Sequence, residues 1–387
     1  MAKGVKVDPN IIIWAIKSSG KNVELLSEKF TKIRDWIDVE AENELTVNEL
    51  NKLSKELRVP FGYFFLKEPP VEDVEILKFR TVNNEEHENP SRELIDTIKY
   101  MKKCQLFMKE TKIDEGFSPL HFIESVSIKD DIFYVAKEIK KELDLPKNWT
   151  LKRKNSFQIL RSAISNLGIL VMQNGVVGSN NKRNLDISEF RAFVLVDQYS
   201  PLIFLNAKDS INGKIFSLCH ELVHIWLGID ELYNDNYESN QIFNNYEIEV
   251  FCNKVAAEII LPFEILQDIY NTKITVYENI KYITSKYNVS DLVVCVRLKQ
   301  SRIISSEDFN IVYNKLHEEM QENLSNRAAS SSGGNFYNTQ GSRIDPNFAY
   351  SVNNQAKEGK ILYTEAYKLI GAKGKTFDNL IAHMEGR

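Results

Sequence analysis

Residues 216–228 read FSLCHELVHIWLG, which places two imidazoles four positions apart and a carboxylate directly after the first. On an α-helix, residues four positions apart share one face, with Cβ atoms about 5–6 Å from each other. His220 and His224 could therefore both reach one zinc ion through bonds of about 2.0–2.1 Å. Glu221 is turned about 100° from His220, so its carboxylate could approach a metal-activated water without being a ligand. The alternative is an ordinary helix that contains two satisfied histidines, and we expect the zinc site.

A zinc site that keeps an open position needs a third protein ligand. The segment 246–262, YEIEVFCNKVAAEIILP, is the obvious source, because it follows closely and is rich in acidic residues. It has helical character and ends at a proline, which cannot continue a helix. Glu247, Glu249 and Glu258 are all candidates by type. Spacing alone does not choose between them, because each could belong to a solvated helix face.

The elements that must position these residues can be predicted from the pattern. Ser210 is a suitable N-cap and Gly228 a suitable stop for the helix that carries the motif. The preceding segments 168–173, 191–197 and 201–206 are rich in β-branched and aromatic residues, and a hairpin-length turn separates the last two. We therefore expect a small sheet that leads into the helix.

The whole chain has the composition of a globular protein. Of its 387 residues, 43% are hydrophobic, which is enough for more than one core. The net charge of −5 excludes a general basic surface for nucleic acid. The chain has neither an apolar N-terminal signal segment nor a run of about 18 apolar residues, and its four cysteines form no CxxC pair. We expect a cytoplasmic protein with no membrane contact and no disulfide framework.

Helical patterns dominate outside the sheet, so the expected fold class is α+β and mostly helical. Residues 326–335 are small, polar and rich in Gly and Ser, which is typical of a flexible joint. The predicted parts are 1–70, a helical domain; 71–150, a helical connector; 151–310, the domain that carries the motif; 311–335, a linker; and 336–387, a C-terminal helical module.

The two motif segments resemble the ImmA/IrrE family of zinc metallopeptidases, whose pattern is HExxH followed by a helix reading E-x-x-[AC]-N-x-x-A-A-x-x-[LI]-x-P. The resemblance implies that His220, His224 and Glu249 are the zinc ligands and that Glu221 is the catalytic carboxylate. It also implies a zincin-like peptidase core. Further matches to the family pattern are Asn253, Ala256, Ala257 and Pro262, and in the strands Arg191, Phe193, Leu195, Pro201, Ile203 and Asn206, with Ala192 in place of glycine.

A subgroup of this family fuses an N-terminal Xre-like helix-turn-helix domain to the peptidase. Residues 60–70 with 78–81 are similar to the junction of that subgroup, and 333–337 with 359–380 are similar to its tail. Fusions of this kind are similar to regulators found beside toxin genes, and stand-alone members cleave Xre-type repressors. The resemblance therefore implies a repressor or a toxin–antitoxin component as the partner.

The N-terminal helices do not favour DNA binding. A recognition helix needs basic or amide side chains that reach phosphates and base edges, but 32–45 offers Lys32 and Arg34 among a larger number of acids. Residues 1–70 hold 11 Lys and Arg against 11 Asp and Glu. The segment from Phe30 to Trp36 is also short for a full turn between two regular helices. We expect an Xre-like fold that docks a protein and does not read duplex DNA specifically.

Two functions remain open from the sequence. The first is a zinc-dependent endopeptidase that cleaves its partner through a metal-activated water, with Glu221 as general base and then acid. The second is an antitoxin-like or transcription-regulating interaction protein that docks its partner without cleaving it. The intact set of metal and carboxylate residues favours the first. We also expect 191–197 or 201–206 to offer an edge strand along which an extended substrate pairs.

Three smaller features complete the pattern. On a helix, Cys219 points about 100° away from His220, so we expect a buried structural thiol and not a ligand. Residues 280–305 read as two helices joined by a turn, and we expect them to support the packing of the core. Neither the oligomeric state nor the oxyanion-stabilising residue follows from the sequence. Candidates for the latter by type alone are Tyr233, Tyr237, Tyr337, His317 and His383.

Overall fold

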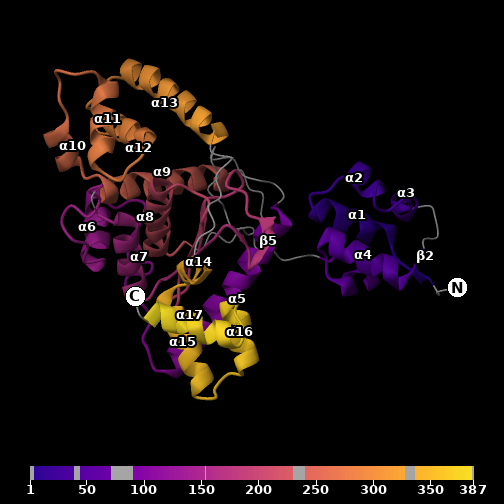
Figure 1. Ribbon diagram of the computed structural model, residues 1–387. Coiled ribbons are helices and arrows are strands. Elements are labelled where there is room, and N and C mark those ends of the chain that lie inside the picture. The colour runs from indigo at the N-terminus through magenta and orange to yellow at the C-terminus, as the bar shows by residue number, and fades with distance from the viewer. Residues whose placement is uncertain are drawn as a thin grey trace. The chain divides into compact units, whose positions relative to one another are not determined.

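The computed structural model describes residues 4–38, 44–70, 90–152, 154–229, 240–326 and 336–385 (Figure 1). The chain divides into two compact units. The first holds the N-terminal residues and the start of α5 (Arg92–Asp114), and the second holds the described residues from Tyr100 onward. Among the described helices, none has the length and apolar character that crossing a bilayer requires. Of the predicted linker 311–335, residues 311–326 belong to the helix α13 (Ser306–Asn326) and 327–335 lie outside the described residues. The 78–81 segment and both Tyr233 and Tyr237 also lie outside them.

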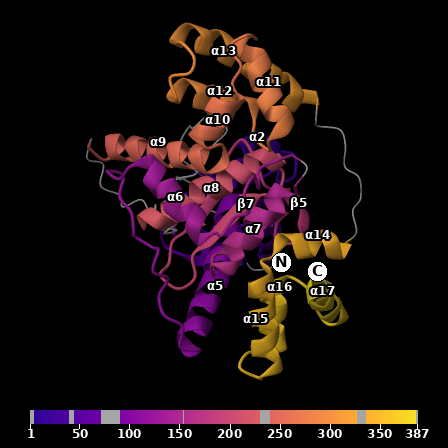
Figure 2. The ribbon, with the colours of Figure 1, turned by 90° about the vertical axis from the view of Figure 1, so that its left-hand side faces the viewer.

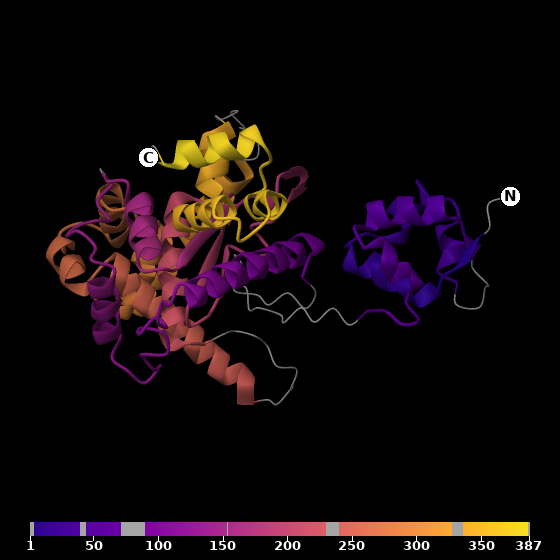
Figure 3. The same ribbon diagram turned by 90° about the horizontal axis from the view of Figure 1, so that it is seen from below.

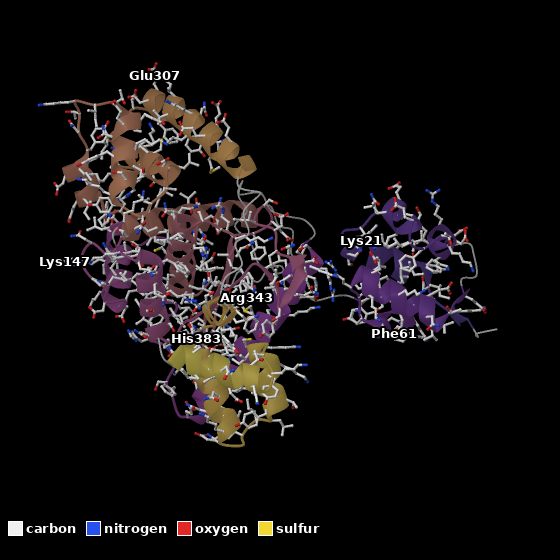
Figure 4. The ribbon with its side chains drawn as sticks, viewed as in Figure 1. Lys21, Phe61, Lys147, Glu307, Arg343 and His383 are labelled. Atoms are coloured by element: carbon white, nitrogen blue, oxygen red, sulfur yellow. The ribbon has the colours of Figure 1, made fainter. Side chains whose placement is uncertain are left out.

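The first unit is a small bundle of short helices, as the apolar spacing predicts. Buried aliphatic residues of its helices form one core with Phe64. Lys21, labelled in Figure 4, and Lys29 both form ion pairs with Glu56. The elements are β1 (Val5–Lys6), α1 (Pro9–Ser18), α2 (Val23–Ser27), α3 (Ile33–Trp36), β2 (Glu44–Leu45), α4 (Val47–Leu57) and the 3-10 helix η1 (Phe61–Phe65).

A three-stranded sheet lies at the centre of the second unit. Its strands are β3 (Leu170–Asn174), β6 (Ala192–Leu195) and β7 (Leu202–Asn206), in the order β3-β7-β6. β7 pairs in parallel with β3 and antiparallel with β6. A separate two-stranded sheet joins β4 (Val176–Val177) to β5 (Asn180–Asn184). All three expected strands are present, and the mostly helical α+β fold class is confirmed.

The two faces of the sheet carry different sets of side chains, and one face packs on helices. Ala192, Val194 and Ile203 share one core with α7 (Ser156–Asn166) and α8 (Ile211–Leu227) (Figure 2). Phe193 and Phe204 stack on the opposite face, with ring centroids 5.0 Å apart. This alternation is the period of two that a strand imposes on its side chains. The helix that carries the motif therefore lies directly against β6 and β7.

Further helices extend the core around α8. α9 (Asn240–Ile260) packs along α8 and against α6 (Ile132–Glu142). The two helices expected within 280–305 are α11 (Val276–Lys286) and α12 (Asp291–Gln300), and buried residues of both join the core. α10 (Phe263–Ile269) precedes them and α13 (Ser306–Asn326) follows. Their expected role as packing support agrees with this arrangement.

Four helices form the C-terminal part of the second unit, and the segment that joins the first two lies at the outer edge of β3. The four helices are α14 (Phe336–Arg343), α15 (Pro346–Lys357), α16 (Tyr363–Ile370) and α17 (Lys375–Glu385), and Figure 3 shows them in yellow beside α5. The Asp345 carboxylate accepts a hydrogen bond from the Val171 amide at 3.1 Å, and the Arg161 guanidinium donates to the Val171 carbonyl at 3.1 Å. Arg161 also donates to the carbonyl of Ile344 at 2.8 Å. Both outward backbone groups of Val171 are thus satisfied by side chains.

Candidate metal centre

The helix that carries the motif is defined at both ends by its sequence. The Ser210 hydroxyl accepts a hydrogen bond from the Gly213 amide at 3.0 Å, which caps the start of α8. Gly228 ends the helix at a φ of 64°, a left-handed conformation that glycine adopts at no steric cost. A Cβ atom at Gly228 would also overlap the side chain of Glu124. Both predicted ends of the helix are confirmed.

The structure brings together His220, His224 and Glu249. Their potential ligand atoms all lie within 4.8 Å of one another. The two Nε2 atoms are 3.0 Å apart, and the Glu249 carboxylate oxygens lie 3.2 Å from His220 Nε2 and 3.3 Å from His224 Nε2. In a tetrahedral zinc site with bonds of 2.0–2.1 Å, two ligand atoms are about 3.3–3.4 Å apart. The two Nε2 atoms and the Glu249 carboxylate are therefore spaced as ligands of one such site need to be, and two imidazoles with one carboxylate are a donor set that zinc accepts.

The centre is buried except toward Glu249. His220 and His224 are 1% and 2% exposed, and Glu221 is 5% exposed. Burial tends to raise the pKa of Glu249, but the charge and hydrogen bonds of the two imidazoles outweigh it and hold the pKa well below its usual range. The carboxyl is therefore ionised, which is the form that binds a metal.

The other two acidic candidates of α9 have different surroundings. Glu247 is exposed to solvent and is turned about 200° from Glu249 around the helix axis. Glu258 is buried and forms an ion pair with the Arg297 guanidinium. Its carboxylate also accepts a hydrogen bond from the Phe263 amide at the start of α10. Its carboxylate thus joins α9 to α10 and α12. Of the three glutamates, only Glu249 lies with the imidazoles.

Cys219 and Cys252 are buried thiols that are not joined in a disulfide. Burial raises the pKa of Cys219 well above its usual range, and its sulfur is not part of the metal-ligating group. The expectation of a structural thiol agrees with this environment.

The described candidates for oxyanion stabilisation have other contacts. His383, labelled in Figure 4, lies on α17 with its Nε2 atom 2.9 Å from Asn338 Oδ1. The Tyr337 hydroxyl accepts a hydrogen bond from Asn379 at 3.2 Å. His317 stacks on Tyr313 within α13. None of these contacts joins the candidate to the metal centre.

The strand order decides which of the two segments expected to offer an edge strand can do so. Segment 201–206 forms β7, which pairs on both sides and is therefore the central strand. It cannot offer an edge to a substrate, because its backbone groups are used by β3 and β6. Hydrophobicity could not reveal this order, since edge and central strands of a buried sheet are equally apolar. Of the two segments considered, β6 is the one at an edge.

An ion pair beside β6 was not foreseen from the sequence. Arg191 directly precedes the strand, and its Nη1 atom lies 3.3 Å from each carboxylate oxygen of Asp209. Asp209 itself directly precedes the cap of α8. The available signal was an acidic residue next to the N-cap Ser210, where the helix dipole favours negative charge.

Comparison with known proteins gives two matches to family models. Residues 165–299 match the IrrE N-terminal-like domain of the Peptidase M78 family, and residues 344–383 match a domain of unknown function, DUF8813. No curated protein matches the chain. The first match contains the sheet, α8 and Glu249 on α9. This region is thus similar to a metallopeptidase domain, which supports a metallopeptidase-type function with a metal cofactor.

Proposed function

We propose that this protein is a zinc-dependent endopeptidase that cleaves a protein partner. The observation that carries the proposal is the ligand set on α8 and α9, in which the two Nε2 atoms lie 3.0 Å apart and each lies 3.2–3.3 Å from one oxygen of the Glu249 carboxylate, with Glu221 next to the first ligand. This set lies within the region similar to the Peptidase M78 family. When bound, zinc would polarise the scissile carbonyl and lower the pKa of a water toward ~7.

The residues of the site have two different roles, metal ligation and proton transfer. His220, His224 and Glu249 would hold the metal. Glu221 accepts the proton of the attacking water at its carboxylate and delivers it to the amine nitrogen that leaves. General acid–base catalysis of this kind contributes typically ~10²–10⁴-fold. The burial of Glu221 supports this role, because the proton that it takes from the water and gives to the amine is then handled in a site of restricted solvent access.

The outer edge of β6 is where an extended peptide would bind. The Asn206 amide donates to the Arg191 carbonyl at 2.8 Å, so by antiparallel alternation the N–H and C=O groups of Ala192 and Val194 point away from β7. Among the described residues, these outward groups make no hydrogen bond, whereas the corresponding groups of Val171 on β3 are satisfied. A peptide that adds to β6 would gain main-chain hydrogen bonds and lie over the face that packs on α8.

The partner class follows from the family resemblance and is part of the proposal. An Xre-type repressor or a toxin–antitoxin component would be recognised by docking to the first unit and cut at the metal centre. In the first unit, two lysines are already paired with Glu56. This supports a protein partner over duplex DNA, because those charges are partly neutralised.

Replacing Glu221 by Gln tests the proposal. The change keeps side-chain size and leaves the three ligands in place, so the protein should fold and bind zinc while the base is lost. The wild type, Glu221→Gln and the matched control Glu247→Gln should each be co-expressed with the protein encoded by the neighbouring gene. We expect a cut partner with the wild type and the control, and an uncut partner that co-purifies with Glu221→Gln. If Glu221→Gln keeps every cellular effect and no chain yields a fragment, the protein docks its partner without cleaving it.

A further inference from the structure

The start of edge strand β6 is tied to the start of α8 by a largely buried ion pair. The side chains of Arg191 and Asp209 are 21% and 3% exposed, and Arg191 Nη1 lies 3.3 Å from both Asp209 oxygens. Arg191 is the residue before Ala192, the first residue of β6. Asp209 is the residue before Ser210, the cap of α8. The pair therefore connects the strand proposed to bind substrate with the helix that carries two metal ligands.

The position of the Asp209 carboxylate is determined by more than Arg191. Its Oδ1 atom also accepts a hydrogen bond from the Ser210 amide at 2.7 Å. It lies over the first turn of α8, where a Cβ atom at Gly213 would overlap the carboxylate. Glycine at position 213 therefore leaves the room that the carboxylate occupies, although glycine costs a helix about 1 kcal/mol relative to alanine.

The end of β7 closes the same corner. The Asn206 amide donates to the Arg191 carbonyl at 2.8 Å, and the Asn206 side chain donates to the Phe190 carbonyl at 3.3 Å. Asn206 is fully buried. The start of β6, the end of β7 and the start of α8 thus meet at one point that is held by hydrogen bonds and charge.

A small rotation at this corner would displace the metal centre. His220 follows Ser210 by ten residues, which is about 15 Å along a helix. A tilt of 5° about the corner would therefore move the imidazole by about 1.3 Å relative to β6. Because α9 packs along α8, Glu249 would move with the two histidines. The tilt would leave the metal ligands together and change their place relative to the strand.

We propose that Arg191 and Asp209 are positioning residues that align the metal centre with the edge of β6. The inference rests on the proposed function, since it assumes a peptide paired with Ala192 and Val194. Such a peptide presents its carbonyl at a place set by the strand, while the ligands are placed by α8. A misplacement of about 1 Å can cost on the order of 10²-fold in rate. The ion pair would act on this alignment and not on the metal itself.

The other end of β6 provides a matched control. Asp197 follows the strand and accepts a hydrogen bond from Lys109 Nζ at 2.6 Å. Lys109 belongs to α5, so this ion pair ties the strand to a helix that carries no metal ligand. Asp197→Asn removes a comparable ion pair from the same strand without touching the tie to α8.

The alignment can be measured without a known substrate by using two zinc-binding probes on the zinc-loaded full chain. Acetohydroxamate reports the metal alone, and an aliphatic tripeptide hydroxamate reports the metal and the strand together. The dissociation constant of acetohydroxamate divided by that of the tripeptide hydroxamate measures the affinity gained from pairing with β6. We expect this ratio to fall by about 10-fold or more in Asp209→Asn and in Arg191→Met. Acetohydroxamate affinity and zinc content should stay at wild-type levels.

Three variants complete the experiment. Arg191→Lys keeps the charge and should retain a larger ratio than Arg191→Met. Gly213→Ala pushes the Asp209 carboxylate away without removing any charge and should lower the ratio as Asp209→Asn does, which gives a second route if one variant fails to fold. Asp197→Asn should keep the wild-type ratio. Thermal unfolding of each variant shows that the chains compared are folded.

Each outcome decides a different point. If neither probe binds the wild type, the zinc site fails and the inference fails with it. If the peptide adds no affinity in the wild type, the metal site stands but the role of β6 and the alignment are refuted. If Asp209→Asn keeps the wild-type ratio, or if Asp197→Asn lowers the ratio equally, the positioning role is refuted while the proposed function is left intact.

Discussion

Replacing Glu249 by Ala should remove most of the zinc affinity of this protein, and replacing Glu247 by Ala should not change it. Glu249 provides a carboxylate with one oxygen 3.2 Å from His220 Nε2 and the other 3.3 Å from His224 Nε2. Glu247 is two residues away on the same helix, carries the same charge, and is exposed. The pair of variants therefore separates ligation from a general change of charge near the centre.

The size of the effect follows from the share that one of three protein ligands contributes to zinc binding. Structural zinc sites in small domains have apparent binding free energies of about 10–16 kcal/mol. If three similarly placed ligands contribute similar shares, one ligand accounts for roughly 3–5 kcal/mol. At 1.4 kcal/mol for each factor of ten, the loss is roughly 10²- to 10⁴-fold in affinity. The two remaining imidazoles would still bind zinc weakly.

Competition with a chromophoric chelator of known affinity measures this directly. The wild type and Glu247→Ala should hold one zinc per chain against a chelator that strips Glu249→Ala. Circular dichroism of the metal-free chains should coincide, because Glu249 lies at the surface end of the centre and contributes little to the core. Wild-type zinc affinity in Glu249→Ala would refute the ligand assignment, and an equal loss in Glu247→Ala would show that charge alone is responsible.

Three further predictions concern the fold and the first unit. Gly228→Ala should lower the free energy of unfolding by more than the ~1–2 kcal/mol that a left-handed alanine costs, because its Cβ atom would overlap Glu124. In denaturant titrations, adding Glu124→Ala should restore part of this loss, and a wild-type midpoint for Gly228→Ala would contradict the prediction. Burial raises the pKa of Asp345 above its ordinary value of 3.8, so the contribution of this residue to stability is greatest below pH 3.8 and is lost as the pH rises through the pKa of the folded state. The unfolding free energy of the wild type minus that of Asp345→Asn should therefore fall as the pH rises from 3.8, and a difference that does not change with pH would contradict this. The full chain should show no saturable, sequence-dependent binding to its own promoter at about 150 mM salt, as measured by fluorescence anisotropy; binding tighter than micromolar would overturn the expectation of a protein-docking unit.

Local features of α8 were predictable because capping and helical spacing depend only on neighbouring residues. Ser210 and Gly228 bound the helix as expected, and a spacing of four residues places His220 and His224 on one face wherever the helix packs. The three strands of the sheet were likewise predictable from their composition, with ends that differ by a few residues from the expected segments. The buried state of Cys219 followed from its place on the helix.

The order of the strands was decided only by the tertiary structure. Segments 191–197 and 201–206 are equally apolar, yet β7 is central and β6 is at an edge. Strand order depends on which surfaces far away in the chain cover each edge. On β3 that cover comes from Asp345 and from Arg161, which belong to segments more than 170 residues apart, and no local pattern links them.

The sequence by itself determined two of the ligand atoms of the centre, since both lie on one helix, and it restricted the third to the acidic residues of the next helix. The pattern of residues alone did not choose between the three glutamates of that helix. The packing of α9 on α8 makes this choice. That packing turns Glu249 toward the imidazoles, leaves Glu247 in solvent and pairs Glu258 with Arg297. The link between Arg191 and Asp209 also exists only in the folded chain, because 18 residues separate them and their contact depends on how β6 and α8 pack. Helix and strand patterns encode which faces are buried, but the partner of each face is set by the whole core.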